Sequence, residues 1–163
     1  MSARRLPSMQ DPPIWQRLLA ALAYLLPLSD AIPFGKALLL QFPVLQLLAV
    51  PALPLITVQQ AIPFGGLVVF LALYLLVVRN SQVPYLIRFN VLQAILLDIV
   101  LVLLTLAFDT LLGSLAASFA VRTLENTIFL GCVALVLFAV VESLRGKEAE
   151  IPTVSEAVRM QLY

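Results

Sequence analysis

The most constraining feature of this chain is a set of apolar runs long enough to cross a lipid bilayer. A membrane-spanning helix needs about 20 mostly apolar residues, and we count four candidates among the 163 residues. The composition agrees, because 62% of the residues are hydrophobic and only 12% are charged. Soluble domains have about 45–50% and about 25%, and a soluble fold of this length could not bury so much apolar surface. The sequence therefore predicts an all-α integral membrane protein.

The four predicted spans are residues 14–32, 61–78, 88–108 and 124–142, within a membrane domain of residues 14–145. An apolar stretch between the first two spans, residues 37–56, carries Pro43, Pro51 and Pro54. Proline removes a backbone donor where no water can replace it, so we expect a proline-broken re-entrant or interfacial segment here, not a fifth span.

Two tails flank the predicted membrane domain. Residues 1–13 form a short N-terminal tail, and residues 146–163 form a polar C-terminal tail. In the C-terminal tail, Thr153 and Glu156 have the spacing of a capping box. This spacing predicts a short surface helix that begins next to Thr153.

The distribution of Lys and Arg predicts the orientation, because cytoplasm-type compartments hold the positively charged loops. With four spans, eight of the ten basic residues share one side with both termini, and only Lys36 and Arg122 lie opposite. A fifth span would give a weaker division of six against four. We therefore expect both termini on the cytoplasmic or stromal side. Arg79, Asn80 and Arg88 would form an inside-facing basic loop, which either fixes the topology at anionic headgroups or receives a partner's acidic segment.

The third predicted span carries polar residues at membrane depth. Asp98 lies ten residues after Arg88 and eleven before Asp109, which places it about 15 Å from either end of a helix, near the bilayer midplane. A carboxylate there costs about 2.5–3.5 kcal/mol even on a lenient scale, so it should face protein or water. Four polar side chains fall within an arc of about 140° on this helix: Asn90, Gln93, Asp98 and Thr105.

Two interpretations of this polar face stay open. The face could line a hydrated groove or contact a partner's transmembrane segment. Alternatively, Gln93 and Asp98 could simply hydrogen-bond neighbouring helices inside the protein, at about 1 kcal/mol for each such bond.

Several function classes are excluded by the chemistry that is missing. A net charge of +1 gives no basic field for nucleic acid. With no His and a single Cys, Cys132 within an apolar run, the chain has no disulfide, no usual zinc ligands and no His-based acid or base. Asp98 and Asp109 would lie about 16 Å apart along the helix axis, too far to act on one bond. We therefore expect no enzyme, no catalytic residues, and no cofactor or metal site.

Residues 87–99, IRFNVLQAILLDI, resemble the hallmark segment of the Tic 20-kDa membrane subunit family, which belongs to the protein translocon of the chloroplast inner envelope. Other segments follow the order of that family: YLLPLSD at 24–30, Phe42 and Pro43, Pro51 to Pro54, Ile62 to Phe64, Tyr74, VVRN at 77–80, Gly146, Lys147, Ile151, Pro152, Ser155 to Ala157, and Gln161.

The resemblance implies a four-helix fold with both termini on the stromal or cytoplasmic side, and a role as a membrane component of a protein-conducting complex. No long Ser- and Arg-rich transit peptide is recognisable. We therefore expect either a cyanobacterial member of the plasma or thylakoid membrane, or a plastid-encoded member of the chloroplast inner envelope.

The leading functional hypothesis is a membrane-embedded, non-enzymatic subunit of a protein translocation or membrane-protein assembly complex. Its expected partners are the lipid bilayer, other translocon or membrane-protein subunits, and further copies of the chain. Four closely packed helices leave no lumen of polypeptide width, so any conduit would form between copies or between subunits. The alternative is a small ion or solute channel in which the midplane Asp98 is the selectivity or gating carboxylate.

Overall fold

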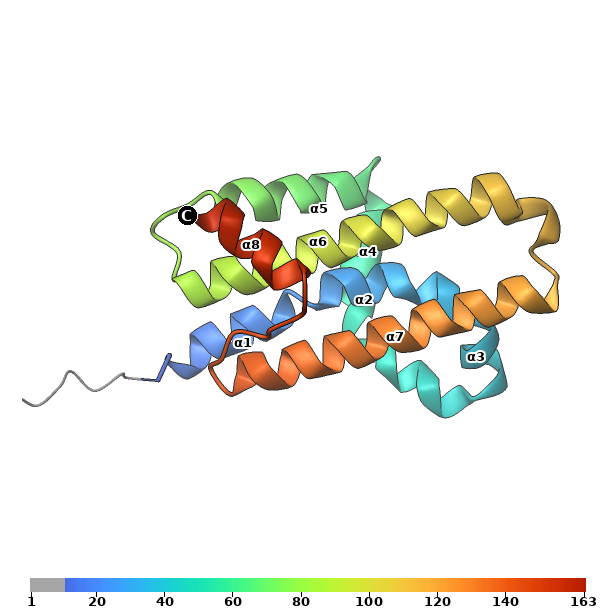
Figure 1. Ribbon diagram of the computed structural model, residues 1–163, viewed down its shortest axis with the longest axis horizontal. Coiled ribbons are helices and arrows are strands. Elements are labelled where there is room, and N and C mark those ends of the chain that lie inside the picture. The colour runs from blue at the N-terminus through green and yellow to red at the C-terminus, as the bar shows by residue number, and fades with distance from the viewer. Residues whose placement is uncertain (1–10) are drawn as a thin grey trace, which may run out of the picture.

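A computed structural model describes residues 11–163, which fold into helices joined by short turns (Figure 1). The predicted N-terminal tail, with Arg4 and Arg5, falls mostly on residues 1–10, outside the described residues. No strand is present within residues 11–163. The α-helices are α1 (Ile14–Leu22), α2 (Leu25–Ala31), α3 (Lys36–Gln41), α4 (Leu53–Ala61), α5 (Gly65–Leu73), α6 (Tyr85–Ala107), α7 (Phe119–Leu144) and α8 (Val154–Leu162).

The first apolar segment breaks between α1 and α2, close to a proline. Pro27 has no N–H to donate to the carbonyl of Ala23, so the regular helical ladder cannot continue through this point. The Ala23 carbonyl instead accepts a hydrogen bond from the N–H of Leu26 at 3.2 Å. The break places the Tyr24 side chain in the core, where it is fully buried.

The proline-rich segment after α3 consists of short helices. Two 3₁₀ helices, Pro43–Leu48 and Val50–Ala52, lead into α4. Each proline stands at the first or second position of its helix, where the N–H has no partner within the helix and proline costs little. In Figure 1, α4 runs across α2 and α6, whereas α1, α2, α5, α6 and α7 follow the long axis of the molecule. Whether this segment is re-entrant or interfacial remains a prediction.

Four helical segments are long and apolar enough to cross a membrane, in agreement with the expected fold class. They are Ile14–Gln41, Pro43–Ala61, Tyr85–Leu115 and Phe119–Leu144. These four segments differ from the four predicted spans. The helical segment Gly65–Val78 is too short to count as a candidate span, whereas the proline-rich segment Pro43–Ala61 is long enough. The assignment of the second crossing to residues 61–78 therefore stays a prediction.

The two longest helices extend beyond their apolar runs. α6 begins at Tyr85, just after Pro84, and continues as a π-helical turn, Phe108–Leu112. α7 begins after Ser118, whose Oγ accepts a hydrogen bond from the N–H of Val121 at 3.3 Å. This N-cap compensates one unpaired backbone donor, so the helix begins five residues before the predicted boundary at residue 124.

The molecule has a packed interior and an apolar outer surface. Tyr24, Phe89 and Phe129 are buried in the core, whereas large apolar side chains such as Leu103, Leu111 and Leu137 are exposed. A water-soluble protein rarely exposes so much contiguous apolar surface. The outer face is therefore suited to contact with lipid acyl chains.

The C-terminal tail folds back over the bundle. α8 lies over α6 (Figure 1) and buries Ser155 and Val158. The predicted capping box is wrong, because the Thr153 side chain makes no cap hydrogen bond and its φ is 69°. The turn before α8 is held by Ser155 instead, because its Oγ accepts a hydrogen bond from the N–H of Ile151 at 2.8 Å.

A glycine makes the tight approach of α4 and α5 possible. A Cβ on Gly65 would overlap the carbonyl of Gln59, whereas a Cβ on Gly66 would meet open space. We predict that Gly65→Ala lowers the free energy of unfolding by about 1–3 kcal/mol, as expected for overpacking. Gly66→Ala is the matched control and should not be destabilising, because alanine favours helix more than glycine does. Thermal unfolding of both variants in detergent micelles tests this, and equal stabilities would contradict it.

Candidate functional site

The polar face of α6 begins with Asn90, whose side chain is fully buried. Its Oδ1 accepts hydrogen bonds from the Tyr24 hydroxyl at 2.7 Å and from the Ser143 hydroxyl at 3.0 Å. Its Nδ2 donates to the carbonyl of Leu86 at 2.8 Å. One amide thus joins the α1–α2 break, α6 and α7.

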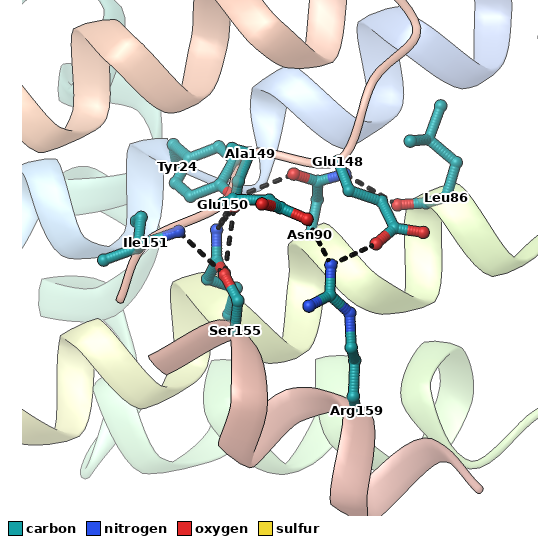
Figure 2. A network of polar contacts seen from close by, with 10 residues as sticks. Tyr24, Leu86, Asn90, Glu148, Ala149, Glu150, Ile151, Ser155 and Arg159 are labelled. Atoms are coloured by element: carbon teal, nitrogen blue, oxygen red, sulfur yellow. Dashed lines mark hydrogen bonds and ion pairs between the residues drawn. The ribbon is translucent and has the colours of Figure 1, made fainter. Parts of the chain in front are cut away.

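One turn further along α6, Gln93 holds the C-terminal tail. Its Nε2 donates to the Tyr24 hydroxyl and to the carbonyl of Ala149, both at 2.9 Å. Its Oε1 accepts from the Ser155 hydroxyl at 2.7 Å. Figure 2 shows the tail residues Ala149, Ile151 and Ser155 gathered close to Tyr24 and Asn90. We call these residues, with Gln93 and Ser143, the amide network.

Arg159 fastens the outer side of the tail. Its guanidinium donates to Glu150 at 2.8 Å and to Glu148 at 3.1 Å (Figure 2), and it lies 5.7 Å from the ring centroid of Phe89. The hydrogen bonds with Glu150 and Glu148 raise the pKa of Arg159, whose guanidinium is charged in any case. Ion pairs that reach solvent contribute little to stability, and these pairs are partly exposed, so we assign the main hold on the tail to the buried amides.

Asp98 lies deeper along α6 and has different neighbours. Its carboxyl group is buried and stands close to that of Asp30 on α2. The two carboxyl groups line one cavity of about 380 Å³ between α2, α5 and α6, which we call the Asp cavity. Within the described residues, Oδ1 of Asp98 has no hydrogen-bond partner.

The other predicted site residues lie apart from these groups. The Thr105 hydroxyl donates to the carbonyl of Leu101 in its own helix at 3.0 Å. Arg88 donates from Nε to the carbonyl of Val78 at 2.9 Å and so ties the loop before α6 to the end of the preceding helix. Oδ1 of Asn80 accepts from the N–H of Gln82 at 3.0 Å, and Arg79 is exposed.

The predicted polar face is therefore divided three ways. Asn90 and Gln93 contact other parts of the protein, Asp98 faces Asp30, and Thr105 bonds to its own backbone. The assignment of the whole face as a lining remains a prediction. Sequence reasoning missed Asp30, Ser143 and the inward roles of Tyr24 and Ser155, although Tyr24 and Asp30 both lie in the motif YLLPLSD and Ser155 lies in another matched segment.

The described residues offer no cluster of metal ligands and no accessible thiol. Among residues 11–163, no three His, Cys, Asp or Glu side chains are grouped so that they could hold a metal ion. Cys132 is buried on α7, with its Sγ 3.8 Å from the carbonyl of Pro27. A thiol in such apolar surroundings is a packing group and a poor nucleophile.

The amide network predicts how the tail can be released. Gln93→Leu removes both the donor to Ala149 and the acceptor for Ser155, and unpaired buried polar groups cost about 1–3 kcal/mol each. Hydrogen exchange of the α8 amides in the variant should therefore be about tenfold faster or more. Thr105→Val is the matched control, because that hydroxyl bonds only to its own helix. Unchanged exchange in Gln93→Leu would contradict the assigned role of Gln93.

Comparison with known proteins identifies the family. The family model described as "Chloroplast import apparatus Tic20-like" matches residues 1–158. A Tic20 family protein of Synechocystis sp. is 41% identical over 90% of this chain and 92% of its own length. Protein TIC 20-II, chloroplastic, of Arabidopsis thaliana is 34% identical over 92% of this chain and 74% of its own. The Tic20 family protein Ycf60 of Gracilaria tenuistipitata var. liui is 35% identical, with 93% and 78% covered. With these matches over nearly its whole length, the chain belongs to the Tic20 family.

Proposed function

We propose that this protein is a membrane-embedded, non-enzymatic subunit of a protein translocation or membrane-protein assembly complex. The observation that carries the proposal is membership in a family named for the chloroplast import apparatus, over residues 1–158. The exposed apolar surface and the four long apolar helices support an integral membrane location. The membranes to consider are the cyanobacterial plasma or thylakoid membrane and the chloroplast inner envelope.

The arrangement of the charges supports an orientation with both ends of the chain on the cytoplasmic or stromal side. In Figure 1, the start of α1, the loop between α5 and α6, and the tail with α8 lie at one end of the bundle. Basic residues cluster in these segments, and the positive-inside rule favours this end for the cytoplasm or stroma. Arg79 and Arg88 belong to this end as the inside-facing basic loop.

The packing of the bundle limits how the subunit could conduct a polypeptide. Tyr24, Phe89 and Phe129 fill the interior, and packed helices leave no channel of that width. We therefore propose that a conduit forms between copies of the chain or between this chain and other subunits. The Asp cavity opens to the side of the bundle and is the candidate contact, while the amide network keeps the helices in place around it.

One observation favours the alternative function of a small ion or solute channel. Asp98 and Asp30 place two carboxyl groups in one cavity, at the position on α6 that we expect near the bilayer midplane, and acidic side chains in a pore select cations. This alternative requires a continuous hydrated path past Asp98 in a single copy or a homo-oligomer.

Co-purification from the native membrane separates the two functions. We predict that the protein, solubilised in mild detergent, carries other translocation subunits or nascent client chains that mass spectrometry identifies. The control is an unrelated membrane protein with the same affinity tag. Recovery only as a homo-oligomer, with single-channel conductance that Asp98→Asn abolishes, would contradict the subunit proposal and support the channel.

Two matched serines test the orientation. Ser81, in the loop before α6, and Ser114, in the turn before α7, are both exposed and belong to opposite ends of the bundle (Figure 1). In a Cys132→Ala background, a membrane-impermeant maleimide applied from the outside should label Ser114→Cys and leave Ser81→Cys unlabelled. The reverse pattern, or equal labelling of both before lysis, would contradict the proposed sidedness.

A further inference from the structure

The Asp cavity contains two acidic groups and is otherwise apolar. Asp98 comes from α6 and Asp30 from α2. The remaining lining residues come from α5 and α6: Gly66, Leu67, Phe70, Ile99, Val102 and Leu103. The sequence placed a single carboxylate near the midplane, and the fold adds a second one beside it.

Asp98 has an unsatisfied oxygen in this cavity. Its side chain is more than nine-tenths buried, with 6% of the residue exposed, and its Oδ1 has no hydrogen-bond partner among residues 11–163. The carboxyl groups of Asp30 and Asp98 hydrogen-bond each other, which requires a shared proton, because ionised carboxylates only accept hydrogen bonds. The pair then still keeps one negative charge. A buried charge without a partner is costly, so the cavity lacks a positively charged donor.

The described part of the chain does not supply that donor. Its ion pairs join Arg17 to Asp11, Arg145 to Glu142, and Arg159 to Glu148 and Glu150. These pairs belong to α1, the end of α7 and the C-terminal tail, and none includes Asp30 or Asp98. Within residues 11–163, no basic side chain therefore pairs with the two carboxyl groups.

The rim of the cavity indicates where the partner approaches. Leu67 on α5 and Leu103 on α6 are 57% and 59% exposed, so the cavity opens sideways between two lipid-facing helices. On another side of Asp30, Gln59 and Gln60 line a second hollow of about 360 Å³. An apolar rim around a polar floor fits an apolar helix that carries one polar side chain.

We propose that the Asp cavity binds a transmembrane helix of a partner protein that carries a single basic side chain at the depth of Asp98. The Lys or Arg donates to the free oxygen of Asp98 and balances the negative charge that the pair keeps, while the flanking apolar residues of the helix pack against the α5–α6 rim. The carboxyl groups also attract a matching cation more strongly in lipid than they would in water. This proposal deepens the proposed function, because it names the class of partner that the subunit holds.

A photo-crosslinking experiment with synthetic helices tests the proposal. The full-length protein is reconstituted in phosphatidylcholine vesicles with a Leu/Ala helix of about 22 residues, which carries photo-leucine and one central Lys. Two control peptides have Leu in place of the Lys, or the Lys moved to the helix end. We expect about tenfold more covalent adduct with the central-Lys peptide than with either control, the ratio produced by about 1.4 kcal/mol.

Variants of the chain locate the interaction. Asp98→Asn and the double variant Asp30→Asn/Asp98→Asn keep the side-chain size and should reduce the adduct to the level of the Leu peptide. Asp109→Asn is the matched control, since Asp109 is exposed and lies outside the Asp cavity, and it should leave the yield unchanged.

Two results would overturn the proposal. Equal adduct yields from the three peptides with the unaltered protein would show that the cavity does not select a basic side chain, as expected if protons or small cations already neutralise the pair. A central-Lys preference that persists in the double Asn variant would place the contact elsewhere. Because the vesicles contain no other subunit, such failures leave the proposed translocation role intact. That role is tested separately, by the co-purification experiment.

Discussion

The interior of a bilayer holds no water, and this governs how the polar side chains of α6 find partners. Every polar group at that depth must find its partner within protein, and α6 carries a line of such groups. Asn90 and Gln93 find theirs in Tyr24, Ser143, Ala149 and Ser155. The same bonds fix the break in the first apolar segment, join α6 to α7 and hold the C-terminal tail against the bundle. Asp98 also belongs to this line, and within residues 11–163 its Oδ1 has no hydrogen-bond partner.

Much of the fold could be predicted, because apolar runs of spanning length have few alternatives in lipid. The all-helical class and the inward direction of Asn90, Gln93 and Asp98 follow from composition and helical periodicity. The helical nature of residues 43–61 was harder to foresee. Proline disfavours a helix interior but is tolerated at the first positions, and Pro43, Pro51 and Pro54 all stand there.

The partners of the polar face could not be predicted, because periodicity describes one helix and says nothing of its neighbour. Thr105 lies within the same arc as Asp98, yet its hydroxyl bonds to its own backbone. Asp30 lies near Asp98 because α2 packs beside α6, and the periodicity of α6 does not predict this neighbour. Ser155 was expected in a surface helix, and its bond to Gln93 depends on the course of the tail after α7. The polar face of α6 thus has two parts. Asn90 and Gln93 hydrogen-bond to other parts of the chain, whereas Asp98 lines the Asp cavity, which opens sideways.

The central claim is that the side of α6 carrying Asp98 faces protein, while the side carrying Val100, Leu103 and Leu106 faces lipid. The most direct test is a nitroxide scan of residues 96–107 in a Cys132→Ala background in lipid vesicles, with collision rates measured against oxygen, which concentrates in the acyl chains. We expect a helical period with maxima at Val100, Leu103 and Leu106 and minima at Asp98 and Leu101. A maximum at Asp98, or a flat profile across the scan, would contradict it.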